Sequence, residues 1–169
     1  MEEEKLKVPV YEGMSKILEV VNASYLCRLM GVHTSWISPR QNQRIDTNGF
    51  QYAYTPEDVS RLNQTLPLLA NVILNQCIIP KELYADREAV AIHIKEKVKP
   101  VLILRYLAVN RMGRDRRWLE KRTYIPDKPN IRRTYFTPTD AADFNSSFQE
   151  IILYLRGITL EYEPPKQLL

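Results

Sequence analysis

Two segments of the chain have apolar residues spaced three and four positions apart, the pattern of one face of an α-helix. The first segment carries Val59, Leu62, Leu66, Leu69 and Ile73, and the second carries Ala141, Phe144, Phe148, Ile151 and Leu155. Each begins with Thr-Pro, at residues 55–56 and 137–138, and acidic residues follow. Thr is a good N-cap, Pro fits the first helical turn, and acidic side chains favour a helix N-terminus. The pattern predicts two helices that begin in the same way.

These helices belong to an internal repeat with a fixed offset. MGVHTSWISPR at 30–40 aligns with MGRDRRWLEKR at 112–122, and the alignment continues without a gap through the two helices. The matched pairs include Trp36 and Trp118, Arg40 and Arg122, Tyr54 and Phe136, Asp58 and Asp140, and Asn63 and Asn145. Similarity at a fixed offset defines the unit of a fold. We therefore expect a mainly α protein of two tandem modules, 1–84 and 85–169, that share a chain path and pack on each other.

Each module is predicted to place two helices and a tight turn before its long helix. In the first repeat, residues 22–31 form the helix before the turn, with Asn22 as N-cap and Gly31 as the C-terminal stop. Residues 32–41 form the helix after the turn, and a short helix is expected at 15–21. The first three helices and the turn make a helix-turn-helix unit.

Four further positions shape this unit. The small Cys27 lies four residues before the turn glycine, where it lets the helices cross closely, and the second repeat has the larger Val109 there. Trp36 and Trp118 follow the turn at matched positions, and we expect both to be largely buried in equivalent places.

A short hairpin or loop is expected between the third helix and the closing helix of each module. In the first repeat, Asn48-Gly49 stands before an alternating segment, which predicts a hairpin with a type I′ turn because both residues tolerate positive φ. The second repeat has lost this glycine and gained prolines, so residues 126–133 should be more irregular.

Two prolines alter the predicted helices of the first repeat. Pro39 lies three residues after Trp36, so the third helix either ends early or has changed its role, in which case the Tyr52 and Tyr54 segment would pack against the sister module. Pro67 is predicted to bend the closing helix. Residues 84–99 form a further predicted helix with Asp86 as cap, as a connector or as the first helix of the second module.

The composition is that of a globular protein, with 44% hydrophobic and 26% charged residues, and only the segments MEEEKLK and EYEPPKQLL are expected to fray. No apolar run reaches the length of a membrane span, and the N-terminus is acidic where a signal peptide would be basic. A cytoplasmic protein is predicted. Cys27 and Cys77 are expected to be reduced core thiols, since two cysteines with His33 and His93 lack the spacing of a metal site.

Catalysis is not expected. The chain has only five glycines and no glycine-rich phosphate loop, no His pair at metal spacing, and no Ser or Cys in a signature of activation. Acidic pairs such as Glu57-Asp58 are explained by the helix that they begin. We therefore predict a protein without enzymatic activity, cofactor, metal or small-molecule substrate.

The net charge of +4 is unevenly distributed. Residues 99–134 hold 11 Lys and Arg against 3 Asp and Glu, whereas residues 1–98 and 135–169 are both net acidic. A local cationic segment attracts phosphate groups and indicates a nucleic-acid partner, or it forms a solvated basic face.

The turn and its flanking helices resemble the helix-turn-helix superfamily of bacterial and phage repressors. The phrase YL, MG, W and an aliphatic residue, an NG loop, TPE and an LN-x-x-L helix also resembles a small uncharacterised domain family of gut anaerobes, present here in tandem at about residues 15–75 and 97–157. The resemblance implies that the helix after the turn enters the major groove of double-stranded DNA. The DNA-binding residues would then be Arg114, Arg116, Arg117, Lys121, Arg122, Arg132 and Arg133 in the second repeat, and His33, Thr34, Ser35, Ser38, Arg40 and Arg44 in the first.

The sequence thus predicts a DNA-binding transcriptional regulator of a phage or mobile element. Two modules in one chain would imitate the two-fold dimer of a repressor. The sequence leaves open whether the chain also forms homo-oligomers. The alternative is a protein-interaction or structural module that keeps the scaffold, has lost DNA reading and docks an acidic partner through the basic segment. RNA binding through the same residues is a third hypothesis.

Overall fold

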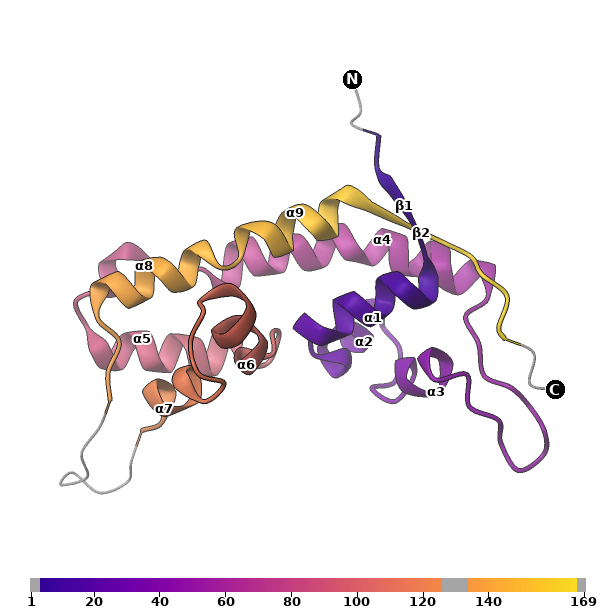
Figure 1. Cartoon of the computed structure of the whole chain (residues 1–169), viewed down its shortest axis with the longest axis horizontal. Helices are drawn as coiled ribbons and strands as arrows, with labels where there is room; N and C mark the ends of the chain where they lie inside the picture. The colour runs from indigo at the N-terminus through magenta and orange to yellow at the C-terminus, as the bar shows by residue number, and fades with distance from the viewer. Residues whose placement is uncertain (1–3, 126–133, 167–169) are drawn as a thin grey trace. The chain divides into compact units, whose positions relative to one another are not determined.

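The computed structural model describes residues 4–125 and 134–166. These residues are mainly helical and include one small two-stranded sheet (Figure 1). They form two compact units, of which unit 2 is Asn71–Ile152 and unit 1 contains the described residues on either side of it. The mainly α prediction is confirmed.

The two units do not follow the predicted division at residue 84. Unit 1 ends inside α4 (Pro56–Val72), after Ala70, and the chain returns to it inside α9 (Gln149–Gly157), after Ile152. Ala70 and Ile152 are themselves matched positions of the two repeats. Each unit therefore combines the first part of one repeat with the end of the closing helix of the other. A helix can supply apolar residues to two cores along its length, so the repeat in sequence is not the compact unit in space.

Unit 1 joins the two ends of the chain. Its elements are β1 (Leu6–Pro9), α1 (Val10–Val20), α2 (Ala23–Met30), α3 (Ile37–Gln41), most of α4, the end of α9, and β2 (Ile158–Glu161). Strands β1 and β2 are parallel, with Val8 opposite Leu160, and both of these side chains are buried. The prediction that Leu6, Lys7 and Glu161 fray is wrong, because backbone pairing and apolar burial hold the two segments together.

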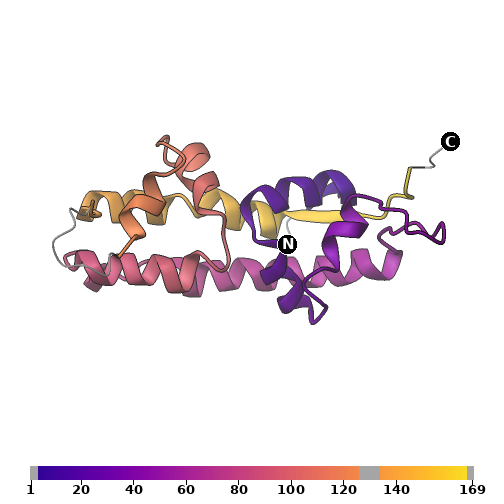
Figure 2. The ribbon, with the colours of Figure 1, turned by 90° about the horizontal axis from the view of Figure 1, so that it is seen from below.

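Helix α1 packs along β2 (Figure 2). Gly13 makes this close approach feasible, since a Cβ atom at this position would overlap the Leu160 side chain.

The secondary-structure elements of unit 2, in the described part of the chain, are all helices joined by loops. Its elements are the end of α4 with the π-helical turn η1 (Ile73–Cys77), η2 (Lys81–Leu83), α5 (Arg87–His93), η3 (Ile94–Val98), α6 (Leu104–Tyr106), η4 (Leu107–Arg111), α7 (Trp118–Thr123), α8 (Pro138–Ser146) and the start of α9. The predicted cap of the helix after residue 84 is confirmed, since the Asp86 side chain accepts a 3.0 Å hydrogen bond from the Ala89 amide. The predicted second closing helix is divided at Ser147 into α8 and α9.

The turns before α3 and α7 are equivalent. Gly31 and Gly113 both have positive φ, 76° and 64°. The Val32 amide donates to the Cys27 carbonyl at 3.0 Å, and the Arg114 amide donates to the Ala108 carbonyl at 2.8 Å. The second turn thus contains one additional residue, which the π-helical turn η4 accommodates.

The additional residue corrects the sequence alignment before the turn. Ala108 is fully buried, as Cys27 is, whereas Val109 is 46% exposed. The small position of the second repeat is therefore Ala108 and not Val109, and both repeats keep a small residue at the helix crossing.

The Asn48-Gly49 segment forms a hairpin loop, but not with the predicted type I′ turn. Ile45 and Gln51 form an antiparallel bridge, and the Gly49 amide donates to the Asp46 carbonyl at 3.1 Å. Gly49 has a φ of 82°, whereas Asn48 does not have positive φ. This is a type I turn followed by a left-handed glycine. The corresponding residues of the second repeat, 126–133, lie outside the described residues.

Pro39 and Pro67 are both accommodated within helices. Helix α3 begins at Ile37, so Pro39 lies in the first turn, where amide groups have no intrahelical acceptor. The helix ends after five residues, at Gln41. Helix α4 continues through Pro67.

Tyr54 is buried inside unit 1, with its hydroxyl donating to Gln41 Oε1 at 2.9 Å. Its ring lies 5.3 Å from that of Tyr11 in the same unit. Cys27 and Cys77 are both buried free thiols, in units 1 and 2 respectively, as the sequence predicts.

Candidate nucleic-acid interface

The loop between η4 and α7 is fixed by local hydrogen bonds to Asp115. After Gly113, the Asp115 carboxylate accepts the Arg117 amide at 2.9 Å, and the Asp115 carbonyl accepts the Trp118 amide at 2.9 Å. Helix α7 then begins at Trp118. These local bonds set the direction in which the side chains of the loop leave the unit.

Two apolar residues anchor α7 in unit 2. Leu119 is fully buried, and the Trp118 ring meets Phe136 edge to face at 5.5 Å. Trp118 and Trp36 are not fully buried, but most of the surface of each is covered, as predicted. Their environments are also equivalent, since the ring centroid of Trp36 lies 6.0 Å from that of Tyr54, the counterpart of Phe136.

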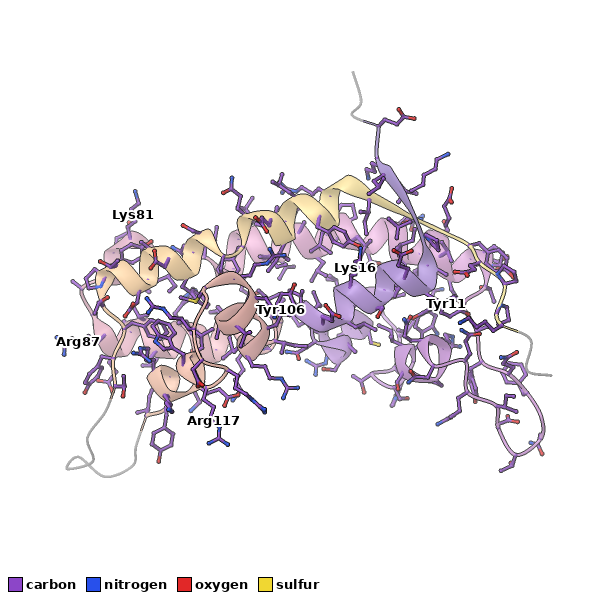
Figure 3. The ribbon with its side chains drawn as sticks, viewed as in Figure 1. Tyr11, Lys16, Lys81, Arg87, Tyr106 and Arg117 are labelled. Carbon is purple, nitrogen blue, oxygen red and sulfur yellow. The ribbon has the colours of Figure 1, made fainter. Side chains whose placement is uncertain are left out.

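Four cationic side chains surround this anchor and are exposed: Arg114, Arg116, Arg117 and Lys121. We call these four residues the α7 cation cluster. Arg114 is 45% exposed and lies 4.0 Å from Asp140, whereas the other three form no ion pair with another described residue. Figure 3 shows Arg117 pointing away from the ribbon. Unpaired cations held close together favour binding of a polyanion.

Arg122 is positioned differently from the cluster. Its guanidinium lies 3.9 Å from the centroid of the Trp118 ring and donates to the Trp118 carbonyl at 3.3 Å. Burial lowers the pKa of Arg122, the Arg114 charge adds to this shift, and the Asp140 charge opposes it. Arg122 therefore acts mainly as a packing partner of Trp118. Arg132 and Arg133, also predicted to bind DNA, lie outside the described residues.

Arg40 occupies the same place in unit 1. Its guanidinium carbon lies 4.3 Å from the centroid of the Trp36 ring, and its Nη1 donates to the Trp36 carbonyl at 2.9 Å. Its Nε lies 3.8 Å from Oδ2 of Asp58. Asp58 and Asp140 each complete a capping box with the Thr three residues earlier, Thr55 and Thr137. The hydrogen bonds are 2.9–3.1 Å long in unit 1 and 3.0–3.1 Å long in unit 2. The Trp–Arg–Asp–Thr cluster is thus structural in both units.

The remaining predicted residues of the first repeat are exposed but mostly neutral. They are His33, Thr34, Ser35 and Ser38 in the turn and helix, and Arg44 in the hairpin. His33 Nδ1 and Ser35 Oγ are 2.7 Å apart, and the Arg44 guanidinium stacks 5.3 Å from the Tyr52 ring. Unit 1 therefore has the same scaffold without the cation cluster.

Sequence reasoning assigned Arg40 and Arg122 to the interface and missed their structural role. The signal was available, because Trp, Arg, Asp and Thr recur together at matched positions of the two repeats. The positions around these residues, in contrast, differ between the repeats: Val32, Thr34, Ser35 and Pro39 correspond to Arg114, Arg116, Arg117 and Lys121.

Unit 2 also has a shallow cavity of about 520 Å³ beside η1 and η3. Two of its polar side chains are already bonded: Gln76 donates to the Lys97 carbonyl at 3.1 Å, and His93 Nε2 lies 3.1 Å from the Cys77 carbonyl. Among the described residues in its lining, Lys97 is the single Lys or Arg. The α7 cation cluster is the stronger candidate site.

Comparison with family models, curated proteins and solved structures found no match to this chain. The helix-turn-helix resemblance of the sequence therefore stays a prediction. In the described part of the chain, none of the helices has the length and apolar character needed to cross a membrane.

Proposed function

We propose that this chain is a non-enzymatic protein that binds double-stranded DNA through the α7 cation cluster of unit 2. Its role would be that of a transcriptional regulator, as the helix-turn-helix resemblance implies. The cluster supplies four exposed cations on one loop and one helix, and three of them form no ion pair with a described residue. Such groups bind phosphates and release the counterions that DNA condenses.

One observation carries this proposal. Between the two units the structural residues at the turn are retained, whereas four neutral positions of unit 1 are exposed cations in unit 2. The shared turn does not require cations at these positions, because unit 1 has the same turn with neutral residues there. A polyanionic ligand explains it directly.

The helix lengths favour phosphate contacts over extensive base reading. Helices α3 and α7 have five and six residues, which is less than two helical turns each. Arg and Lys on so short a helix reach the phosphates on the rims of a groove more readily than a row of base edges. We therefore propose that unit 2 supplies affinity and little sequence preference.

The test is a titration of the full chain against labelled random-sequence duplex DNA over a series of salt concentrations. Replacing Arg114, Arg116 and Arg117 together with Ala should weaken binding and reduce the slope of log K against log salt by about 0.9 for each lost contact. A matched control replaces Lys81, Lys95 and Lys97, which are exposed cations of the same unit, with Ala. Equal losses in the two triple variants would attribute binding to net charge and contradict the proposed surface.

A second function is favoured by the hairpin of unit 1. Phe50 is 60% exposed and Ile45 is 45% exposed, and Phe50 contacts the Tyr52 ring edge to face at 5.1 Å. An exposed apolar tip fits a protein partner better than DNA. Under this alternative the chain is an interaction module, and the DNA titration shows no retention even at low salt.

A further inference from the structure

Asp140 contacts both the start of α8 and a member of the α7 cation cluster. Its Oδ2 atom accepts the Thr137 amide at 3.0 Å, as part of the capping box of α8. Its Oδ1 atom lies 4.0 Å from Nη2 of Arg114. The carboxylate is only 14% exposed, whereas Arg114 is 45% exposed.

The equivalent carboxylate in unit 1 has no such neighbour. Asp58 forms the same capping box with Thr55 and lies near Arg40, the counterpart of Arg122. The counterpart of Arg114, however, is the apolar Val32. A carboxylate facing a cluster arginine therefore occurs in unit 2 and not at the matching place in unit 1.

The contact between Asp140 and Arg114 is too long to be a hydrogen bond. A phosphate oxygen could approach the guanidinium more closely, at the distance of a charge-assisted hydrogen bond. Asp140 cannot move away when this happens, because the capping box holds it at the start of α8. Its negative charge would then remain close to the bound phosphate.

We infer that Asp140 is an affinity-determining residue of the α7 cation cluster, a fixed carboxylate that competes with nucleic-acid phosphate for Arg114. This inference rests on the proposed function, because it concerns the same surface. Asp140 keeps the affinity of the cluster below the value that its cations alone would give. The phosphodiester backbone is the ligand group concerned, so the effect is independent of base sequence.

The test measures duplex affinity for Asp140→Asn, with Asp58→Asn as matched control. Asn at position 140 keeps an oxygen acceptor for the Thr137 amide but removes the charge. We expect Asp140→Asn to bind about two- to fivefold more tightly, the range of an exposed ion pair, and Asp58→Asn to bind like the unchanged protein. In an Arg114→Ala background, the gain from Asp140→Asn should shrink, since the residue that is competed for is absent.

The outcomes separate the two proposals. No binding by the unchanged protein overturns both. Binding by the unchanged protein with an unaltered or weaker Asp140→Asn variant overturns the inference and leaves the proposed function intact. An equal gain in Asp58→Asn also overturns the inference, because it would show a general effect of charge. If circular dichroism shows that Asp140→Asn is unfolded, Asp140→Ser removes the same charge and is judged by the same criteria.

Discussion

The side-chain amide of Asn63 holds both backbone groups of Leu160. Its Nδ2 donates to the Leu160 carbonyl at 2.9 Å, and its Oδ1 accepts the Leu160 amide at 2.7 Å. Asn145, the counterpart of Asn63, holds Ile79 through the same two bonds at 2.9 and 2.7 Å. Leu160 and Ile79 each follow the closing helix of the other repeat. One amide in each unit thus fastens the segment that the other repeat supplies.

Replacing either asparagine should destabilise the fold. Asn63→Ala leaves the amide and carbonyl of a buried residue without partners, which should cost about 2–4 kcal/mol, and Asn145→Ala should cost a similar amount. Chemical denaturation measures the change. Asn63→Asp should be no milder than Asn63→Ala, because a carboxylate cannot donate to the Leu160 carbonyl. The exposed Asn75→Ala is the control, and an equal loss in it would argue against a special role for Asn63 and Asn145.

The turn glycines should tolerate alanine poorly, for conformational reasons alone. A Cβ atom at Gly31 or Gly113 would meet no atom within 4 Å, but both residues have positive φ. We expect Gly31→Ala and Gly113→Ala to lose about 1–2 kcal/mol of stability. Gly157 is equally unobstructed and lacks positive φ, so Gly157→Ala should be neutral or stabilising. Thermal unfolding of the three variants gives the comparison, and similar losses in all three would contradict it.

Alkaline pH should destabilise unit 2 through Cys77. Burial raises the pKa of this thiol from 9.0 to about 12. Below pH 9 the thiol is protonated in both the folded and unfolded chain, so its contribution is constant. Between pH 9 and about 12 only the unfolded chain ionises, and stability should fall by about 1.4 kcal/mol per pH unit.

Urea denaturation at a series of pH values measures this loss, and Cys77→Ala should flatten the profile over the same range. The folded protein should also resist thiol alkylation at Cys77 at neutral pH. Rapid labelling of Cys77 under native conditions would contradict its burial in the folded protein.

The two classes of arginine around Trp118 should separate stability from binding. Arg122→Ala removes a cation–π contact and a hydrogen bond to the Trp118 carbonyl, so it should lower the melting temperature. Arg116→Ala should leave the melting temperature unchanged and weaken DNA binding, since Arg116 is exposed and unpaired among the described residues. A lower melting temperature in Arg116→Ala together with an unchanged melting temperature in Arg122→Ala would contradict this prediction.

Unit 1 should accept the cation cluster of unit 2. Replacing Val32, Thr34 and Ser35 with Arg should add a second DNA-binding surface, visible as a steeper dependence of affinity on salt. Replacing His33, Thr34 and Ser35 with Ala should change affinity little, because none of the three is a Lys or Arg that could pair with phosphate. If the gain-of-charge variant folds and its salt dependence is unaltered, the scaffolds are not functionally equivalent.

Periodicity and local chemistry in the sequence determined the mainly helical character and the starts and turns that recur in the two repeats. The Thr-Pro starts, the Asp86 cap and the turn glycines depend on neighbouring residues only, so the sequence predicted them correctly. The charge of the cluster was likewise readable, because residues 99–134 hold 11 Lys and Arg against 3 Asp and Glu.

Tertiary structure decided which segments share a core and which arginines remain available. Unit boundaries inside α4 and α9 depend on contacts between segments far apart in the sequence, such as Asn63 with Leu160. Sequence spacing cannot reveal these contacts, because a helix presents the same apolar face to any partner. The same reason explains Arg40 and Arg122, which pack on Trp36 and Trp118, whereas Arg116 and Arg117 have nothing to pack on and face the solvent.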